Sequence, residues 1–235
     1  RGVDLLLCDD ETVAQKLAHE MEEENRTRQN VDRRILQEAL TMLETSFDPE
    51  RDYTIVLSSP EWHAGVIGIV ASRVVECVHR PVVLFTEDPE NGRARGSARS
   101  IPRFHLFNAV HSCGSLLERY GGHRQAAGME IRLDRLDTFR QALNEHAHSV
   151  LQPDDLVAEI RVDLAIDLSE ANSELHRLLR HCGPFGLGNP QPVFMVRGVG
   201  VAGNAREAGD GQHLKLVLSQ GDARLPAIGF HMAER

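Results

Sequence analysis

Apolar and polar positions follow a helical period over residues 12–43, where leucine, isoleucine, valine and methionine recur three or four residues apart. The middle of this stretch, residues 22–34, is almost entirely charged or amide-bearing. A helix that is polar on all sides at its centre is typical of a solvated bridge between domains. The pattern therefore predicts a long connector helix, which begins with a capping box formed by Thr12 and Gln15. A short strand over residues 3–7 is predicted before it.

Short apolar runs alternate with helical patterns between residues 52 and 150. Strands are predicted over residues 53–57, 81–86, 94–99 and 128–133. Helices are predicted over residues 63–78, 106–120 and 136–150. Strands that alternate with helices in this way predict an α/β domain.

The pattern changes after a polar stretch with a proline at residues 152–155. Strands are predicted over residues 158–166, 193–201, 214–218 and 225–230, with one helix at 170–181 and a loop rich in glycine and proline at 182–192. Mostly short strands with one helix predict a small β-barrel or an open sheet. We therefore expect a strand and connector helix over 1–50, an α/β domain over 51–152 and a β domain over 153–235.

The composition, with 41% hydrophobic and 26% charged residues, is that of a soluble globular protein. No apolar run approaches the roughly 20 residues that span a bilayer. The four cysteines include no C-x-x-C pair, which argues against a disulfide framework or a zinc site and favours a reducing, cytosolic setting. The net charge of −9 alone argues against nucleic-acid binding. However, residues 91–105 carry four arginines and no acid, and such a basic seam can steer a polyanion into a groove.

Within this seam, Gly96-Ser97-Ala98-Arg99-Ser100 contains donors suited to phosphate oxygens. Side chains alternate along a strand, so Ser97 and Arg99 are expected on one face. The alternative is a solvated edge strand with exposed arginines. The lack of any acid across 91–105 favours the phosphate-binding interpretation.

A second glycine-rich motif, Gly121-Gly122-His123, lies at a predicted helix-to-strand junction. Gly121 could simply follow the end of the helix, but this explains only one of the two glycines. His123 could donate to a phosphate oxygen or carry a proton near it, and Arg124 adds a further donor.

A third motif, residues 62–73, has glycines at positions 65 and 68 of a predicted helix. Each costs roughly 1 kcal/mol relative to alanine inside a helix, which indicates a close approach of backbone or ligand. The N–H groups at such a helix start could receive an anion. The alternative, which spacing alone favours, is tight helix-to-strand packing with Trp62 and His63 as core residues.

In this order, four motifs resemble the RecJ family of single-strand-specific exonucleases in the DHH phosphoesterase superfamily. They are residues 62–73, 96–100, 121–128 and 184–194, and Asn25-Arg26-x-Arg28 in the connector is similar too. The resemblance covers nearly the whole chain. It implies an α/β plus β fold: a long connector helix, an α/β DHH-associated domain and an OB-fold-like β domain. An OB-fold needs five strands and we count four after residue 155, so we expect the barrel to be incomplete or closed by other residues.

The resemblance also implies which residues act. Ser97 and Arg99 match the family's 5′-phosphate pocket, and Gly122 and His123 match the loop that faces the metals and the scissile phosphate. The implied substrate-binding residues are His63, Arg95, Ser97, Arg99, Ser100, Gly121, Gly122 and Arg124. His123 is the implied catalytic contact to the scissile phosphate. The Asp-His-His motif is absent, so manganese or magnesium would be bound by an N-terminal DHH domain, no metal ligands are expected here, and the chain alone is expected to be inactive.

The implied function is part of a bacterial, cytoplasmic 5′–3′ exonuclease of DNA repair and recombination. Its expected partner is single-stranded DNA, with a helicase or single-strand-binding protein as further candidates and no membrane. One alternative is a DHH-family phosphodiesterase for short oligonucleotides or cyclic dinucleotides, against which the OB-like segment argues. Others are a non-catalytic module that binds single strands and a module that docks a repair partner through its acidic surface.

Overall fold

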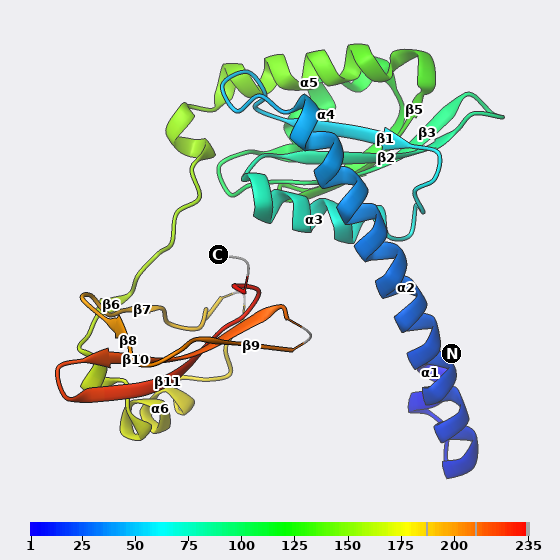
Figure 1. The fold of residues 1–235 in the computed structure, drawn as a ribbon. Coiled ribbons are helices and arrows are strands. Elements are labelled where there is room, and N and C mark those ends of the chain that lie inside the picture. Colours follow the sequence, from blue (N-terminus) through cyan, green and yellow to red (C-terminus); the bar gives the residue numbers. More distant parts are fainter. Residues whose placement is uncertain (187, 210, 234–235) are drawn as a thin grey trace. The chain divides into compact units, whose positions relative to one another are not determined.

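The computed structural model describes residues 1–186, 188–209 and 211–233, which belong to two compact units (Figure 1). The first unit is Arg1–Ala158 and the second begins at Glu159. None of the helices in the described part of the chain combines the length and apolar character needed to cross a membrane.

The first unit begins with a short helix, α1 (Gly2–Leu6), and the long helix α2 (Glu11–Ser46). The long helix is therefore confirmed, but Asp10 caps it in place of the predicted box, since its carboxylate accepts the N–H groups of Thr12 and Val13 at 2.9 and 3.1 Å. The strand predicted over residues 3–7 is wrong. A short apolar run suits a helix as well as a strand, and here α1 packs against α2 instead of pairing with a sheet.

A five-stranded sheet in the order β1-β2-β3-β5-β4 forms the centre of the unit. Its strands are β1 (Ile55–Ser59), β2 (Val82–Asp88), β3 (Arg93–Arg99), β4 (Leu117–Gly122) and β5 (Ala126–Arg132). β1 and β2 are parallel and joined by helix α3 (Ile67–Val78), while the other pairs are antiparallel. The central strands were thus predicted to within a few residues.

The helix predicted over residues 106–120 is wrong in its second half. Helix α4 (Leu106–Ser112) is followed by a 3₁₀ turn, Gly114–Leu116, and then by the edge strand β4. Leu117 is buried and pairs opposite Ile131, so contact with β5 overrides the local helical pattern. Gly121 therefore lies in a strand and does not follow a helix end.

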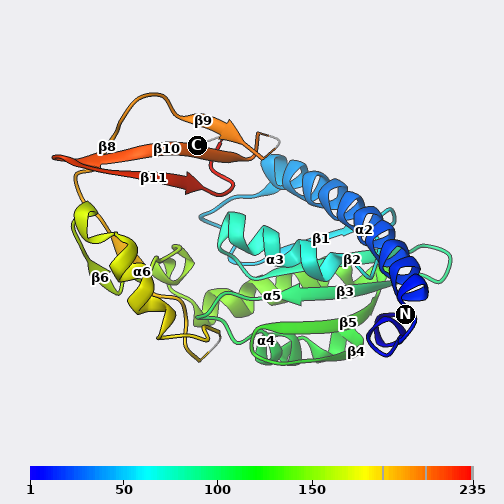
Figure 2. The ribbon, with the colours of Figure 1, turned by 90° about the horizontal axis from the view of Figure 1, so that it is seen from below.

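Helices cover the two faces of the sheet unequally. On one face, α4 and α5 (Leu136–Val150) enclose a core that includes Phe85, Ile131 and Phe139. On the other face, α2 and α3 bury residues of β1 and β2 but none of β5 or β4. Figure 2 shows this second face, with β3, β5 and β4 following one another beside α3. α3 packs against part of β3, and the same side of β5 and β4 is left open.

Arg80 joins the loops at one end of the unit. Its buried guanidinium donates to five backbone carbonyls, at 2.8 to 3.3 Å. The carbonyls belong to Pro49, Asp52, Val78, His79 and Leu156. Burial lowers the pKa of Arg80, and the carbonyl dipoles hold the charge that remains. One side chain thus ties the loop before β1, the end of α3 and the turn at Pro153–Leu156 together.

In the second unit, β10 (His213–Gln220) pairs antiparallel with β11 (Ala223–Gly229), β8 (Gly200–Val201) and β9 (Arg206–Ala208). β6 (Leu164–Ala165) pairs in parallel with β7 (Phe194–Met195), and α6 is Ser173–Arg180. Short 3₁₀ turns lie at Leu133–Arg135 and Leu168–Glu170. The strand predicted at 158–166 is reduced to β6, and the strand predicted at 193–201 is replaced by the two short strands β7 and β8. β9 forms where no strand was predicted. Among the hydrophobic residues described in this unit, Leu168 alone is buried.

Replacing Arg80 with methionine tests its role at the junction. Arg80→Met keeps a long side chain but leaves buried carbonyls without donors, so we expect the free energy of unfolding to fall by about 3 kcal/mol or more. Urea denaturation followed by circular dichroism measures this change. The control is Arg51→Met, which removes an exposed pair with the adjacent Asp52 and should cost less than about 1 kcal/mol. Equal losses in the two variants would contradict the role of Arg80.

Candidate nucleic-acid interface

The open face of the sheet displays a regular array of side chains. β3 alternates between exposed or half-buried residues and buried ones, so Arg95, Ser97 and Arg99 share the α3 side of the sheet. Ser97 lies opposite Gly128 of β5, which in turn lies opposite Gly121 of β4. A hydroxyl and a guanidinium therefore stand beside a strip of uncovered backbone.

Arg99 is held against Ser97 at the start of α3. Its Nη1 donates to Ser97 Oγ at 3.2 Å and to the carbonyl of Ala98 at 2.8 Å. A methyl group added at Gly68 would lie 2.9 Å from Ser97 Oγ and 3.0 Å from Arg99 Nη2. Gly68 thus allows α3 to approach these two side chains. The packing interpretation of this glycine therefore holds, and the packing positions Ser97 and Arg99.

Arg99 differs from the other arginines of the basic seam. Arg93, Arg95 and Arg103 pair with Glu118, Glu130 and Asp155 at 3.2, 3.0 and 3.8 Å. In the described part of the chain, Arg99 has no carboxylate partner. Burial lowers its pKa, but a guanidinium remains charged at neutral pH. A half-buried cation without an anion is a receptor for one, and its fork of donors suits phosphate.

Two glycines keep the neighbouring strands bare. A methyl group at Gly121 would meet no heavy atom within 4 Å, and one at Gly128 only a carbonyl at 3.9 Å. Gly122 is different, because its φ is +153° and a methyl group there would lie 2.4 Å from the Ala126 carbonyl oxygen. Gly122 is therefore needed to close the β4–β5 hairpin, while Gly121 and Gly128 leave space above the sheet.

His123 is exposed at the tip of this hairpin. Its backbone N–H donates to the Ala126 carbonyl at 2.8 Å, and its Nδ1 accepts the Gln125 N–H at 3.3 Å. The ring is thereby tied to the hairpin backbone through one nitrogen. Ala126, to which His123 bonds, pairs opposite Arg99, so His123 lies at the same end of the sheet as Arg99 with β5 between them.

Other predicted residues have structural contacts. Ser100 Oγ donates to the Phe104 carbonyl at 2.9 Å, and Arg124 Nη2 donates to the Pro102 carbonyl at 3.1 Å. Both bonds shape the loop after β3. Gly96 faces the core, where a methyl group would lie 2.5 Å from the Phe85 ring. These contacts account for the residue types without any ligand.

Trp62 and His63 separate in the structure. Trp62 is buried, and its Nε1 donates to Glu38 Oε2 of α2 at 2.9 Å. His63 is exposed, and its Nδ1 accepts the N–H of Gly65 at 3.1 Å. The core interpretation therefore holds for Trp62 and is wrong for His63, which lies in the loop that leads into α3.

The sequence analysis missed Arg119 as a residue of this face and did not connect Gly68 of α3 with it. Arg119 is exposed on β4, but the sequence placed it in a helix, so its neighbours on the sheet could not be predicted. Gly68 was noted for its cost in a helix, yet nothing in the sequence connects it with Ser97 and Arg99, which lie two elements later. Gly114 and Ser115, which are poor helix formers, were the available signal for the early end of α4.

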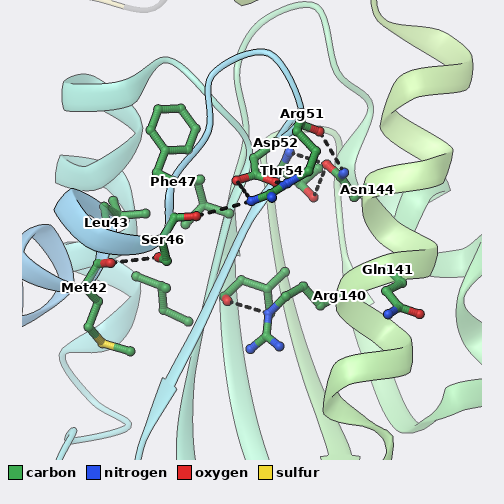
Figure 3. A pocket seen from close by; sticks show the side chains of 13 residues that line it. Met42, Leu43, Ser46, Phe47, Arg51, Asp52, Thr54, Arg140, Gln141 and Asn144 are labelled. Atoms are coloured by element: carbon green, nitrogen blue, oxygen red, sulfur yellow. Dashed lines mark hydrogen bonds and ion pairs between the residues drawn. The ribbon is translucent and has the colours of Figure 1, made fainter.

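A separate hollow of about 590 Å³ lies at the free edge of β1 (Figure 3). There Arg140 Nε donates to the Val56 carbonyl at 3.1 Å, and Asn144 Oδ1 accepts the N–H groups of Tyr53 and Thr54 at 2.8 and 3.0 Å. These side chains cap an edge strand that would otherwise offer unpaired backbone groups. No residue proposed from the sequence lies in this hollow, and its polar groups serve the fold.

Across the described residues, no group of three or more His, Cys, Asp and Glu side chains could hold a metal ion. The open face carries arginines, hydroxyls and backbone, and its carboxylates Glu130 and Asp88 already bond to Arg95 and Asn91, so it suits anions better than a divalent cation.

Two family models match the chain. The model described as DHHA1 domain matches residues 52–149, and the one described as RecJ OB domain matches residues 162–235. Single-stranded-DNA-specific exonuclease RecJ of Bacillus subtilis is 34% identical over 99% of this chain. RecJ of Haemophilus influenzae is 34% identical over the whole of it. The chain spans 29% and 42% of the length of these two relatives.

Solved structures of RecJ proteins are also similar to this chain. A RecJ from Thermus thermophilus in complex with Mn²⁺ aligns with 94% of this chain at a TM-score of 0.76 and 33% identity. The corresponding Mg²⁺ complex aligns with 95% at 0.73 and 35%. The chain covers 32% and 35% of those two structures. The expected arrangement of a long helix, a DHH-associated α/β domain and an OB-like β domain is therefore confirmed.

Substituting Gly68 tests whether its contact with Ser97 and Arg99 matters. Gly68→Ala should leave thermal stability unchanged or slightly raised, because alanine is the better helix former by about 1 kcal/mol. The added methyl group should displace Ser97 Oγ and the Arg99 guanidinium and weaken binding of a phosphorylated oligonucleotide several-fold. Thermal melts and fluorescence anisotropy measure the two effects. Ser72→Ala, one turn further along α3, is the control and should leave binding unchanged.

Proposed function

The chain belongs to the RecJ family, and on that premise we propose that it is the strand-binding part of a 5′–3′ exonuclease specific for single-stranded DNA. In this proposal Arg99 and Ser97 bind the 5′-terminal phosphate. His123 contacts the scissile phosphate. The second unit holds the strand further along.

One observation carries the proposal: among the four arginines of the basic seam, Arg99 is the one without a carboxylate in the described part of the chain. Its guanidinium is already oriented by Ser97 Oγ and the Ala98 carbonyl. A phosphate would therefore find donors that need little reorganisation. Such preorganised, charge-assisted hydrogen bonds are each worth roughly 1.5–3 kcal/mol.

The bare backbone beside this pocket supports a strand rather than a compact ligand. Gly121 and Gly128 leave room for a sugar-phosphate chain to lie close to the sheet. His123 lies at the far end of the β4–β5 hairpin, where its ring is exposed. We assign it the position next to the bond that is cleaved, where it orients the phosphate and offsets its charge.

We assign the divalent metal, Mn²⁺ or Mg²⁺, to a DHH domain outside this chain, because the described residues form no site that fits it. In the second unit, a hollow of about 640 Å³ places Arg206 and Lys215 beside apolar residues of β10 and β11. Cations on an apolar floor suit the backbone and bases of a single strand. We place the whole enzyme in bacterial DNA repair and recombination, alongside a helicase or a single-strand-binding protein.

The decisive experiment is fluorescence anisotropy of the chain with single-stranded oligonucleotides that carry a 5′-phosphate or a 5′-hydroxyl. The wild type should bind the phosphorylated end about tenfold more tightly, and Arg99→Ala should abolish that difference. Loss of one phosphate contact should also reduce the slope of log K against log salt by about 0.7. Circular dichroism checks that the variant is folded.

A matched control separates this effect from the loss of any positive charge. Arg135 precedes α5 and donates to the Ser115 carbonyl at 3.2 Å, away from the open face. Arg135→Ala should keep the full preference for the phosphorylated end. Equal binding of both ends by the wild type, or an Arg99→Ala variant that keeps the preference, would refute the proposed role of Arg99.

Catalysis is tested separately. With Mn²⁺ present, the chain alone should release no nucleotides from single-stranded DNA above the level of a buffer control. The reason is that its described residues form no metal-binding cluster. Release of labelled mononucleotides, followed by gel electrophoresis, is the measurement. Turnover that persists after repeated purification would disprove the assignment of the metal to another domain.

A further inference from the structure

The open face continues beyond Ser97 into a groove of about 860 Å³. The residues that line it include Thr86, Asp88, Arg93, Arg95, Arg119 and Glu130. The groove lies toward the β2–β3 hairpin, and the proposed phosphate pocket lies toward the other end of β3. The chemistry of the groove indicates which group could bind in it.

Strand register places the groove one step from the pocket. Thr86 pairs opposite Arg95, and Arg95 and Arg119 both pair opposite Glu130. These residues form a row across the sheet that is parallel to the row of Ser97, Gly128 and Gly121. Successive residues on one face of a strand are about 6.7 Å apart, so the two rows are within reach of one small ligand.

Two of the three arginines of the groove are already paired. Arg93 is paired with Glu118 at 3.2 Å and Arg95 with Glu130 at 3.0 Å, while Asp88 accepts hydrogen bonds from Asn91. Arg119 is exposed and forms no ion pair within the described ranges. Thr86 Oγ1 is buried there and has no hydrogen-bond partner among those residues. An anion in the groove would therefore meet a free guanidinium on β4.

The direction of a bound strand follows from the proposed function, on which this inference rests. His123 bonds to Ala126, and Ala126 pairs opposite Arg99. The order along the face is thus His123, then Arg99 and Ser97, then Arg95 and Arg119. If the terminal phosphate occupies Ser97 and Arg99 while the scissile phosphate faces His123, the groove lies beyond the 5′ end. A strand that ends in a monophosphate has no atoms there.

We propose that this groove binds the β- and γ-phosphates of a single strand with a 5′-triphosphate, and that Arg119 is the residue that recognises them. Two phosphoanhydride links are long enough to bridge the step between the two rows. Gly121 and Gly128 leave the path between the rows free of side chains. The pocket thereby recognises the 5′-terminal phosphate, and the adjoining groove leaves space for further phosphates attached to it.

The test compares single-stranded oligonucleotides of one sequence that carry a 5′-hydroxyl, a 5′-monophosphate or a 5′-triphosphate, by competition anisotropy with the whole chain. The wild type should bind the triphosphate end three- to tenfold more tightly than the monophosphate end. Arg119→Ala should remove this added gain and keep the preference for monophosphate over hydroxyl. Glu130→Gln removes one of the two acids that line the groove and should increase the gain, while Arg135→Ala should leave all three affinities in their wild-type order.

The outcomes distinguish this inference from the proposed function. If triphosphate binds no better than monophosphate, or if Arg119→Ala keeps the gain, the inference is overturned. The proposed function still stands in that case, provided that the monophosphate preference depends on Arg99. If the wild type does not distinguish monophosphate from hydroxyl, the proposed function fails, and a triphosphate gain that is lost in Arg119→Ala would still support an anion site in the groove.

Discussion

The first unit depends on the guanidinium of Arg80, which holds the loop before β1, the end of α3 and the turn before the second unit through five carbonyls. Arg99, which is half-buried, likewise has no carboxylate partner among the described residues, but it has only Ser97 Oγ and one carbonyl as acceptors there. The same side chain thus has two different roles. Arg80 stabilises the fold because backbone carbonyls accept the hydrogen bonds of its guanidinium. Arg99 retains free N–H donors, which suit an anion.

The position of α3 links these two arginines. Arg80 follows the C-terminal end of α3, and Gly68 at the other end contacts Ser97 and Arg99. α2 packs on α3 through Ile35, Ala39 and Leu43, and Asp32 pairs with Arg73 of α3 at 3.1 Å. Displacing α3 would therefore disturb the proposed phosphate pocket at Ser97 and Arg99 from a distance. Mutations far from the open face can change binding through this helix.

Sequence patterns were sufficient where local periodicity and burial agreed. The helix at Leu136–Val150 was predicted with its observed bounds, and Ser97 and Arg99 share a face because strand side chains alternate. The patterns failed where tertiary contacts decided, as in β4, which forms because β5 offers it a partner. The seam over residues 91–105 looked purely basic, but Glu118 and Glu130 reach it from other strands. Cross-strand neighbours of this kind cannot be inferred from local composition.

The second unit has a different character, because Leu168 is its one buried hydrophobic residue among those described. A sheet with so little apolar surface removed from water has a small stability of its own. A ligand that binds only the folded form of this unit therefore contributes a large share of its total free energy of unfolding. That contribution grows with the logarithm of the ligand concentration. If this unit binds the strand as proposed, its folding and its binding of the strand are thermodynamically linked.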